Sequence, residues 1–294
     1  MTDQCYITDL NYINNLDDYV GVLLDSRLGN MMFQIAAGYA IARRSNKPFF
    51  AIIDEHKIQT SNSEFEYCKY FASTIFKKIK ILTQFPKNCI VLQDNPPFNI
   101  FNPLPTNYKN LVYKGYFQSE KYFADVKSDI LQLFEPPESV LTSIKKLYGD
   151  LSSFNAIHVR RGDYVNDLPR FDVVSANYIN RCIDMIGVND NYIVVSDDIE
   201  WCKTNLKIKN VIFADKRLEV DINKSFYTLM DLYIQTLCKN NITSNSTFSW
   251  WGAWLNQIPN SRVLIPTPWF AKNYFLNNYT KDLYPANWMQ IQKY

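Results

Sequence analysis

The stretch Ala156–Val165, AIHVRRGDYV, indicates the fold class of the chain. Its apolar first half reads as the end of a buried strand, and charged side chains follow at once: His158, Arg160, Arg161 and Asp163. In α/β proteins ligands bind outside the carboxyl ends of parallel strands, so a strand that ends in two guanidinium groups predicts an anion-binding site. Guanidinium is permanently charged, and its planar donors fit phosphate oxygens in pairs. Gly162 allows the backbone to approach a ligand closely.

The same residues have a simpler explanation, in which Arg161 and Asp163 form an ion pair at an exposed strand end. For an isolated RRGD that explanation is the more common one. The histidine changes the balance, because the chain has only two, His56 and His158, and one of them lies inside the charged cluster.

Composition places the chain among globular proteins. Its 294 residues are enough for two domains and a large core, with 47% apolar and 20% charged residues. Aromatic residues make up 15%, and an aromatic-rich core explains them most simply, although carbohydrate-binding and base-binding clefts use such rings too. The formal charge of +2 argues against a nucleic-acid partner that would need a broad basic face.

The cysteines and the N-terminal stretch indicate a compartment. Six cysteines without a CxxC pair fit neither a zinc site nor a disulfide framework, so we expect reduced, mostly buried thiols. The opening MTDQCYITDL lacks the basic and apolar regions of a signal peptide, and the apolar stretch Met31–Ala42 is too short to span a bilayer. We expect a cytoplasmic protein with no integral membrane segment, which leaves peripheral contact with a membrane open. The oligomeric state is not indicated.

Strand and helix patterns alternate through most of the chain, which predicts an α/β fold with parallel sheets covered on both faces. The first half gives strands at 19–24 and 48–53, a helix at 31–44, a weak signal from about 55 to 115, a helix capped by Ser119 that runs to Phe134, and a second helix to Tyr148. We place a domain boundary near residue 150. Beyond it we expect strands at 154–159, 191–195, 211–213, near 242 and at 262–265, and helices at 175–186 with Ser175 as N-cap, after 198, at 226–237 and after 246.

Three of the second-half strands end in polar clusters, HVRRGD, VVSDD and ITSNSTF, and in a parallel sheet these ends share one edge. Ser246 and Thr247 would add hydroxyl and backbone N–H groups at a helix N-terminus, which suits phosphate, but plain helix capping explains them as well. Asp197 and Asp198 would accept hydrogen bonds from ribose hydroxyls or a guanine edge, or cap the next helix. The site interpretation gains because the three clusters occur together.

Metal and nucleotide motifs of other enzyme classes are missing from the sequence. No DxD occurs, so we expect no metal, and arginines with a helix terminus would neutralise a departing diphosphate. No Walker A pattern occurs either, which argues against a P-loop NTPase or kinase.

Several motifs of the chain resemble those of one enzyme family. HVRRGD is similar to the HxRRxD motif of the α-1,2-fucosyltransferases, the inverting glycosyltransferase family 11. Ser26–Gln34 (SRLGNMMFQ) resembles the family's G-x-L-G-N-Q-M-F-Q signature, Gly115–Phe123 (GYFQSEKYF) resembles its middle block, and VVSDDIEWC and SNSTFSWWGAWLN resemble its C-terminal blocks. The matches cover the chain from about residue 26 to 265 in family order, which makes the resemblance highly specific.

The resemblance implies a GT-B architecture of two Rossmann-like domains facing across a cleft. Residues 1–150 would form the acceptor-side domain and residues 151–294 the GDP-fucose-binding domain with an aromatic-rich tail. The implied reaction is inverting transfer of L-fucose from GDP-β-L-fucose to the 2-hydroxyl of a galactoside-type glycan, with no metal and no cofactor.

Site roles follow from the resemblance. Arg160 and Arg161 would hold the diphosphate, His158 and Asp163 would order the nucleotide pocket, and the hydroxyls and ring of Ser246, Thr247 and Phe248 would cradle phosphate and ribose. The catalytic candidates are Arg160, Asn30 and Asp163, with Asp25 as another possible base. Asn30 would orient the acceptor hydroxyl, or merely cap the helix that starts at Met31. Ser26 stands where the family has Gly, and Met31 where it has Gln.

Two alternatives stay open. One is another GDP-fucose enzyme, of the protein O-fucosyltransferase or α-1,6 type, although the continuous SNSTFSWWGAWL block favours the α-1,2 family. The other is a sugar-nucleotide-binding or lectin-like protein without turnover.

Overall fold

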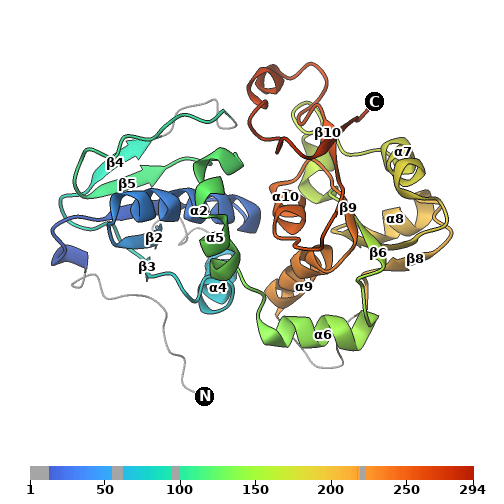
Figure 1. Cartoon of the computed structure of the whole chain (residues 1–294), viewed down its shortest axis with the longest axis horizontal. Coiled ribbons are helices and arrows are strands. Elements are labelled where there is room, and N and C mark those ends of the chain that lie inside the picture. The colour runs from blue at the N-terminus through green and yellow to red at the C-terminus, as the bar shows by residue number, and fades with distance from the viewer. Residues whose placement is uncertain (1–12, 55–61, 94–99, 217, 219–222) are drawn as a thin grey trace. The chain divides into compact units, whose positions relative to one another are not determined.

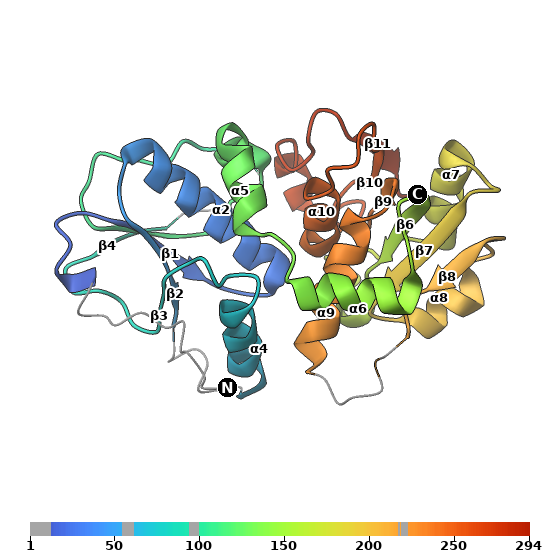
Figure 2. The same cartoon turned by 60° about the horizontal axis from the view of Figure 1, so that its bottom comes forward.

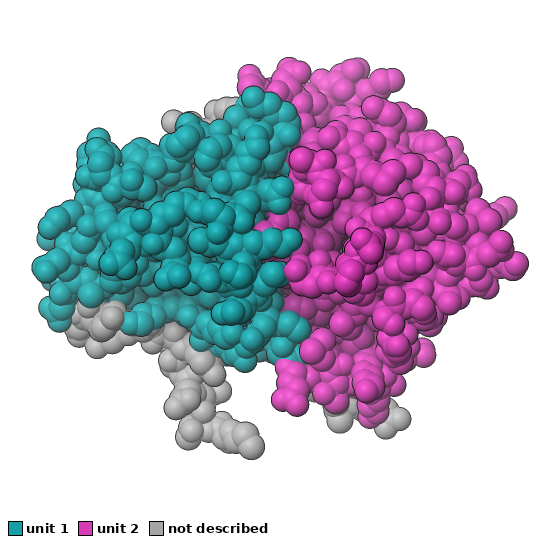
Figure 3. All heavy atoms as spheres, in the orientation of Figure 1, with its two compact units in different colours: residues 1–137, 281–283 teal, residues 138–280, 284–294 magenta. Residues whose placement is uncertain are grey.

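The computed structural model describes residues 13–54, 62–93, 100–216, 218 and 223–294, so Cys5 and His56 lie outside the described residues. The chain divides into two compact units (Figure 3). Unit 1 comprises residues 1–137 and 281–283, and unit 2 comprises residues 138–280 and 284–294. The division at 137/138 differs from the one placed near residue 150, because helix α6 (Glu138–Tyr148) packs against α9 (Lys224–Thr236) of unit 2.

Unit 1 is built on a five-stranded parallel sheet with the order β3-β2-β1-β5-β4 (Figure 1). The strands are β1 (Val20–Leu24), β2 (Phe49–Ile53), β3 (Ile81–Leu82), β4 (Ile90–Gln93) and β5 (Leu111–Lys114). The strands expected at 19–24 and 48–53 are confirmed as β1 and β2. β1 is buried over its whole length, as expected for a central strand covered on both faces.

Helix α2 (Leu28–Ser45) packs on β1 and β2 and begins three residues before the predicted start at Met31. The contact is close: a Cβ on Gly38 would lie 2.2 Å from Val22 Cγ1, so only glycine fits there. Helix α4 (Asn62–Ser73) follows later in the unit.

The helix predicted from Ser119 to Phe134 is wrong as one element. Ser119 does cap a turn, but the turn is a 3-10 segment, η1 (Glu120–Tyr122), followed by η2 (Ala124–Val126) and helix α5 (Lys127–Leu133). Phe123 breaks the pattern with φ −143°. Its ring is fully buried and packs 6.1 Å from the Phe33 ring, so tertiary packing overrides the local helical periodicity.

Unit 2 contains a six-stranded parallel sheet with the order β11-β10-β9-β6-β7-β8. The strands are β6 (Phe154–Val159), β7 (Asn191–Ser196), β8 (Val211–Phe213), β9 (Asn240–Ile242), β10 (Val263–Thr267) and β11 (Met289–Gln292). The first five were predicted. The sixth was not, because its sequence lies in the aromatic-rich tail and shows no strand pattern; it adds to the sheet edge beside β10.

Helices cover both faces of this sheet (Figure 2). Apolar side chains of α7 (Ala176–Ile186) and α8 (Ile199–Asn205) pack with Ile157 and Val159 on one face. On the other face lie α9 and α10 (Thr247–Trp254), which contact each other. Ser175 caps α7 through Tyr178 N–H, as predicted. Since side chains alternate along a strand, His158 points to the face opposite Ile157 and Val159.

The described residues bear on the expectations about membrane segments and cysteines. Among them no helix combines the length and the apolar character needed to cross a membrane. The described cysteines are free thiols, four of them buried (Cys68, Cys182, Cys202 and Cys238) and Cys89 half-buried.

Candidate functional site

The three polar clusters of unit 2 converge at the carboxyl ends of β6, β7 and β9, as expected for one sheet edge. Four side-chain contacts join them. Arg160 and Arg161 bind Asp197 and Asp198 beyond β7, and His158 and Tyr164 contact Ser244 and the Asn245 carbonyl beyond β9. Residues more than 80 positions apart in sequence therefore meet in one place.

Arg160 and Arg161 are held by three carboxylates. Arg160 donates to Asp163 at 2.5 Å and to Asp197 at 2.6 Å, and Arg161 donates through Nε to Asp198 at 3.0 Å. The simpler explanation paired Arg161 with Asp163, whereas the structure pairs Asp163 with Arg160 and Arg161 with Asp198. Both guanidinium groups are mostly buried, which strengthens such pairs relative to exposed ones.

Asp197 is the centre of this arrangement. One carboxylate oxygen accepts from the backbone N–H of Arg161 at 2.8 Å, and the other accepts from the Arg160 guanidinium. A Cβ on Gly162 would lie 2.4 Å from Asp197 Oδ2, so the absence of a side chain at Gly162 is what permits the contact.

Aromatic rings back the two arginines. Arg161 lies over the Trp201 ring at 4.1 Å, a cation–π distance, and the Arg160 guanidinium lies 5.5 Å from the Tyr164 ring. Tyr164 stacks on Phe171 with ring centroids 4.4 Å apart. Burial raises the pKa of Tyr164 to about 12, so its hydroxyl stays protonated and donates to the Asn245 carbonyl. Together with the carboxylates, the Trp201 and Tyr164 rings leave each planar guanidinium group few orientations.

His158 is buried and neutral. Its Nδ1 lies 2.8 Å from Ser244 Oγ, and its ring centroid lies 5.3 Å from that of Phe248. Burial, and to a smaller extent the charge of Arg160, lowers the pKa of His158 to about 3. The imidazole therefore orders the ITSNSTF segment through Ser244 and adds no positive charge for an anion.

The ITSNSTF segment joins β9 to α10. Ser246 caps α10 by accepting from Phe248 N–H, so the capping explanation holds for this residue, and Asp198 likewise caps α8 by accepting from Trp201 N–H. Thr247 and Phe248, the first residues of α10, are half-buried. The half-buried first turn of α10 lies at the same sheet edge as the arginine cluster, with the Phe248 ring next to that of His158.

The sequence prediction missed several residues of this edge. Asn245 is fully buried and donates to the carbonyls of Asp172 and Trp269 at 2.7 and 2.9 Å. Lys293, from the unpredicted end of the chain, is also buried and donates to the Phe270 carbonyl at 3.1 Å; burial lowers its pKa to about 8. The position of Tyr164 and Asn245 inside the motifs was the only available signal.

At the corresponding edge of unit 1, Asn30 lies within helix α2 and does not cap it. The N-cap is Arg27, without a side-chain hydrogen bond, so the capping explanation for Asn30 is wrong. Its carboxamide instead donates to Ser26 Oγ at 2.9 Å and accepts from Gln118 Nε2 at 3.0 Å. Asp25, the candidate base in this unit, donates its backbone N–H to the Gln34 side-chain oxygen.

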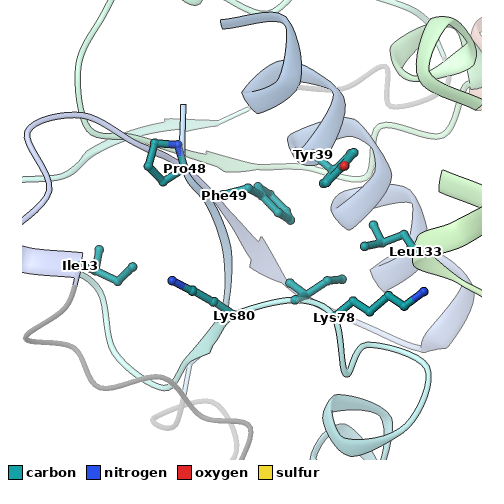
Figure 4. Close-up of a pocket in the computed structure, with 8 residues that line it drawn as sticks. Ile13, Tyr39, Pro48, Phe49, Lys78, Lys80 and Leu133 are labelled. Carbon is teal, nitrogen blue, oxygen red and sulfur yellow. The ribbon is translucent and has the colours of Figure 1, made fainter. Parts of the chain in front are cut away.

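Unit 1 also has a cavity of about 220 Å³ (Figure 4). Its lining includes Pro48 and Phe49 at the start of β2 and Lys80 just before β3. The cavity therefore lies at the amino ends of the strands, opposite to the edge that carries Asn30, and we assign it no role in the chemistry.

Within the described part of the chain, no cluster of three or more His, Cys, Asp or Glu side chains has a geometry for holding a metal ion.

Comparisons with known proteins agree with the motifs. The family model for glycosyl transferase family 11 matches residues 4–292. An α-1,2-colitosyltransferase of Escherichia coli is 30% identical over 291 residues, covering 90% of this chain and 96% of that protein. A galactoside 2-α-L-fucosyltransferase of Caenorhabditis elegans is 30% identical over 197 residues, covering 62% of this chain and 53% of that protein.

Among solved structures, POFUT1 in complex with GDP-fucose is similar with a TM-score of 0.50 and 14% sequence identity, covering 88% of this chain and 99% of that chain. At that identity the likeness concerns the fold alone. Together with the two parallel sheets and their covering helices, it identifies the fold as α/β of the GT-B type, as predicted.

The buried, neutral His158 predicts a specific acid sensitivity. Because its pKa is near 3 in the folded protein and about 6.5 in the unfolded chain, the unfolded chain binds the extra proton between these values, and stability falls as pH drops below 6.5. From pH 7.5 to 5 the loss from this residue is about 2 kcal/mol. Urea unfolding of the wild type and His158→Gln across this range measures it. The variant should lose correspondingly less stability, and equal losses would contradict a buried neutral imidazole.

Proposed function

Because the chain belongs to glycosyl transferase family 11, we propose that it transfers L-fucose from GDP-β-L-fucose to the 2-hydroxyl of a galactoside-type glycan, forming an α-1,2 linkage with inversion. The observation that carries this proposal is the pair of mostly buried guanidinium groups at the carboxyl end of β6, on the sheet edge where α10 begins. That arrangement suits a nucleoside diphosphate better than a neutral ligand.

The names of relatives support the donor and the linkage. One is a galactoside 2-α-L-fucosyltransferase, one is an α-1,2-colitosyltransferase, and a structure of the same fold was solved with GDP-fucose. Colitose is fucose without its 3-hydroxyl, so GDP-colitose is the second candidate donor. A transferase of the protein O-fucosyl or α-1,6 type, and a binding protein without turnover, are the remaining alternatives.

We assign the donor to unit 2 and the acceptor to unit 1. The edge of unit 2 carries fixed charges, which a diphosphate requires, whereas the edge of unit 1 at Asn30 carries carboxamide and hydroxyl groups, which suit a neutral sugar. In unit 2, Arg160 and Arg161 hold the diphosphate, and His158, Ser246, Thr247 and Phe248 shape the pocket beside it.

Charge balance sets a condition on donor binding. Two guanidinium groups face three carboxylates, so the cluster has a formal charge of −1 before any ligand arrives. A diphosphate must therefore replace at least one carboxylate on the guanidinium groups. Asp163 is the partner that exchanges most easily, because its side chain is 51% exposed whereas that of Asp197 is 27% exposed. Asp197 and Asp198 keep the arginines oriented, and they remain near enough to meet ribose or guanine donors.

In the transition state, the bond from fucose C1 to the phosphate oxygen breaks while the acceptor hydroxyl attacks the opposite face. Negative charge grows on the departing GDP, and Arg160 stabilises it where it develops. Because the guanidinium is pre-oriented by Asp197 and the Tyr164 ring, little reorganisation is needed at that moment. The acceptor proton passes to a base, for which Asp163 and Asp25 are the carboxylate candidates, and Asn30 orients the hydroxyl. The sugar nucleotide is the donor substrate, and the proposed reaction uses no cofactor.

The donor assignment is tested directly by turnover. We expect transfer to β-galactosides from GDP-fucose, a 1,2 linkage in the product, and no transfer from UDP-galactose. Parallel reactions with GDP-fucose and GDP-colitose, followed by mass spectrometry and linkage analysis, separate the two candidate donors. Efficient transfer from UDP-galactose with none from either GDP sugar would refute the proposal.

Metal independence follows from assigning the diphosphate charge to arginine. Activity should persist in EDTA at a concentration that strips divalent ions, because Arg160 and Arg161 supply the positive charge in place. Initial rates are compared with and without EDTA, with added Mg²⁺ or Mn²⁺ as control. Complete loss in EDTA that Mn²⁺ restores would assign the role to a cation instead.

Arg160→Lys should be severe although it keeps the charge. Lysine cannot bind Asp197 and a phosphate with one planar group, so we expect kcat to fall about 10²- to 10³-fold. The matched control is Lys203→Arg, which changes the cation of an exposed ion pair with Asp215 elsewhere in unit 2. Near-normal kcat in Arg160→Lys would leave Arg160 with a structural role only.

Asp163→Asn completes this test by separating two roles. If Asp163 only competes with the diphosphate, the variant should bind GDP more tightly and keep its kcat, whereas loss of kcat with unchanged GDP affinity would make Asp163 the base.

A further inference from the structure

Two loops at the carboxyl edge of the unit 1 sheet hold a non-glycine residue in the left-handed region. Ser26 follows β1 and has φ 73°, and Phe117 follows β5, the neighbouring strand, and has φ 49°. Side chains other than glycine rarely adopt such angles, and where they do the surrounding structure must enforce them. Such enforced geometry at the carboxyl edge of a parallel sheet points to a ligand site.

Helix α2 fixes both loops through two side chains one turn apart, Asn30 and Gln34. Gln34 is fully buried. It accepts from the Asp25 backbone N–H at 2.9 Å and donates to the Gly115 carbonyl at 3.0 Å, so it sets the separation of the loops. Gln34 thus accounts for the spacing of the two loops. Asn30 is only half-buried and is not needed for that spacing.

Asn30 forms a chain of hydrogen bonds at the outer end of the same edge. Gln118 donates to Asn30 Oδ1 at 3.0 Å, and Asn30 donates to Ser26 Oγ at 2.9 Å. Each amide therefore has a defined orientation, with its oxygen and nitrogen in fixed places. Ser26 Oγ accepts in this chain, so its own hydrogen remains to donate, and the Gln118 carbonyl oxygen remains to accept.

We propose that Ser26 is an acceptor-specificity residue and that Gln118 is its positioning residue, acting through Asn30. The inference rests on the proposed function and deepens it by naming the groups that select the acceptor. A sugar hydroxyl can both donate and accept a hydrogen bond, and the exposed Ser26 hydroxyl and the half-buried Gln118 carboxamide offer the complementary donor and acceptor. Their fixed orientation favours acceptors whose hydroxyls match it.

The strained backbone at Ser26 allows a role in acceptor binding to be distinguished from a role in loop stability. At φ 73°, glycine relaxes the backbone, so Ser26→Gly should hold or raise the melting temperature. The same change removes the hydroxyl, so it should weaken the acceptor. If Ser26 had only a structural role, acceptor binding would weaken only where the melting temperature falls. The proposal predicts that acceptor binding weakens in Ser26→Gly while the melting temperature is held or raised.

The experiment measures acceptor KM, kcat and melting temperature for the wild type, Ser26→Gly, Ser26→Ala and Gln118→Leu, with GDP-fucose and lactose. Both Ser26 variants should raise the acceptor KM about 5- to 10-fold, the cost of one hydrogen bond, with GDP affinity unchanged. Gln118→Leu frees the Asn30 amide and should lower kcat about 10-fold. The wild type should use lactose faster than its 3-deoxygalactosyl analogue. In both Ser26 variants the ratio of these two rates should be closer to one.

Matched controls use the same chemistry elsewhere in unit 1. Asn46→Gly relaxes another left-handed residue, at the far end of α2, and Gln132→Leu changes an exposed glutamine; neither should alter the acceptor KM. Wild-type acceptor KM and acceptor ranking in both Ser26 variants would overturn the proposal, even if Ser26→Gly raises the melting temperature.

Acceptor binding without donor keeps this outcome distinct from failure of the proposed function. Saturation-transfer NMR with lactose alone requires no turnover. A wild type that binds lactose but does not use GDP-fucose would refute the donor assignment and leave the Ser26 comparison measurable by NMR. A wild type that binds no β-galactoside would overturn the inference itself.

Discussion

The Asp197 carboxylate is the contact on which the arginine cluster depends. It reaches from the end of β7 to the end of β6, where it binds the Arg161 backbone with one oxygen and the Arg160 guanidinium with the other. Removing it would leave a mostly buried guanidinium with one partner fewer, which costs more than the pair contributes when intact. Gly162 makes the contact possible, because any side chain there would occupy the position of Oδ2. The RRGD motif is therefore a steric requirement as well as a set of charges.

The sheet register brings these ends together, and buried polar side chains specify it at the opposite edge. Asn155 of β6 binds Asn240 of β9 at 2.7 Å and the Asn191 carbonyl of β7 at 3.2 Å. A one-residue slip of any of these strands would leave buried amides unpaired and move each side chain of that strand to the opposite face of the sheet. Lys293 and Asn245 then fasten the loop beyond Tyr164, since both donate to the Asp172 carbonyl. These contacts join the last strand of the chain to the loop that follows the arginines.

The sequence was sufficient for five of the six strands of unit 2, because apolar runs mark them, and for the meeting of its three polar ends, because parallel strands end at one edge. It was insufficient where a tertiary contact outweighs a local pattern. Phe123 breaks a predicted helix to bury its ring, and β11 forms only because β10 offers it an edge. Asn30 looked like a cap because the start of α2 was placed three residues late; no capping side chain marks the true start at Leu28. The Gln118 contact, 88 residues away, has no local signature at all.

The two sheet edges use different chemistry to fix their side chains, and the difference matches the proposed ligands. At unit 2, guanidinium and carboxylate groups orient each other. His158 stays neutral, so it does not compete with the arginines for the carboxylates. A charged diphosphate can exchange into such a cluster because it replaces one anion by another. At unit 1, amides and a hydroxyl orient each other without net charge, and a neutral sugar meets them without desolvating an ion. A sugar hydroxyl placed between Arg160 and Asp163 would have to break the ion pair between these two side chains. The fixed polar groups thus favour one assignment of donor and acceptor over its reverse.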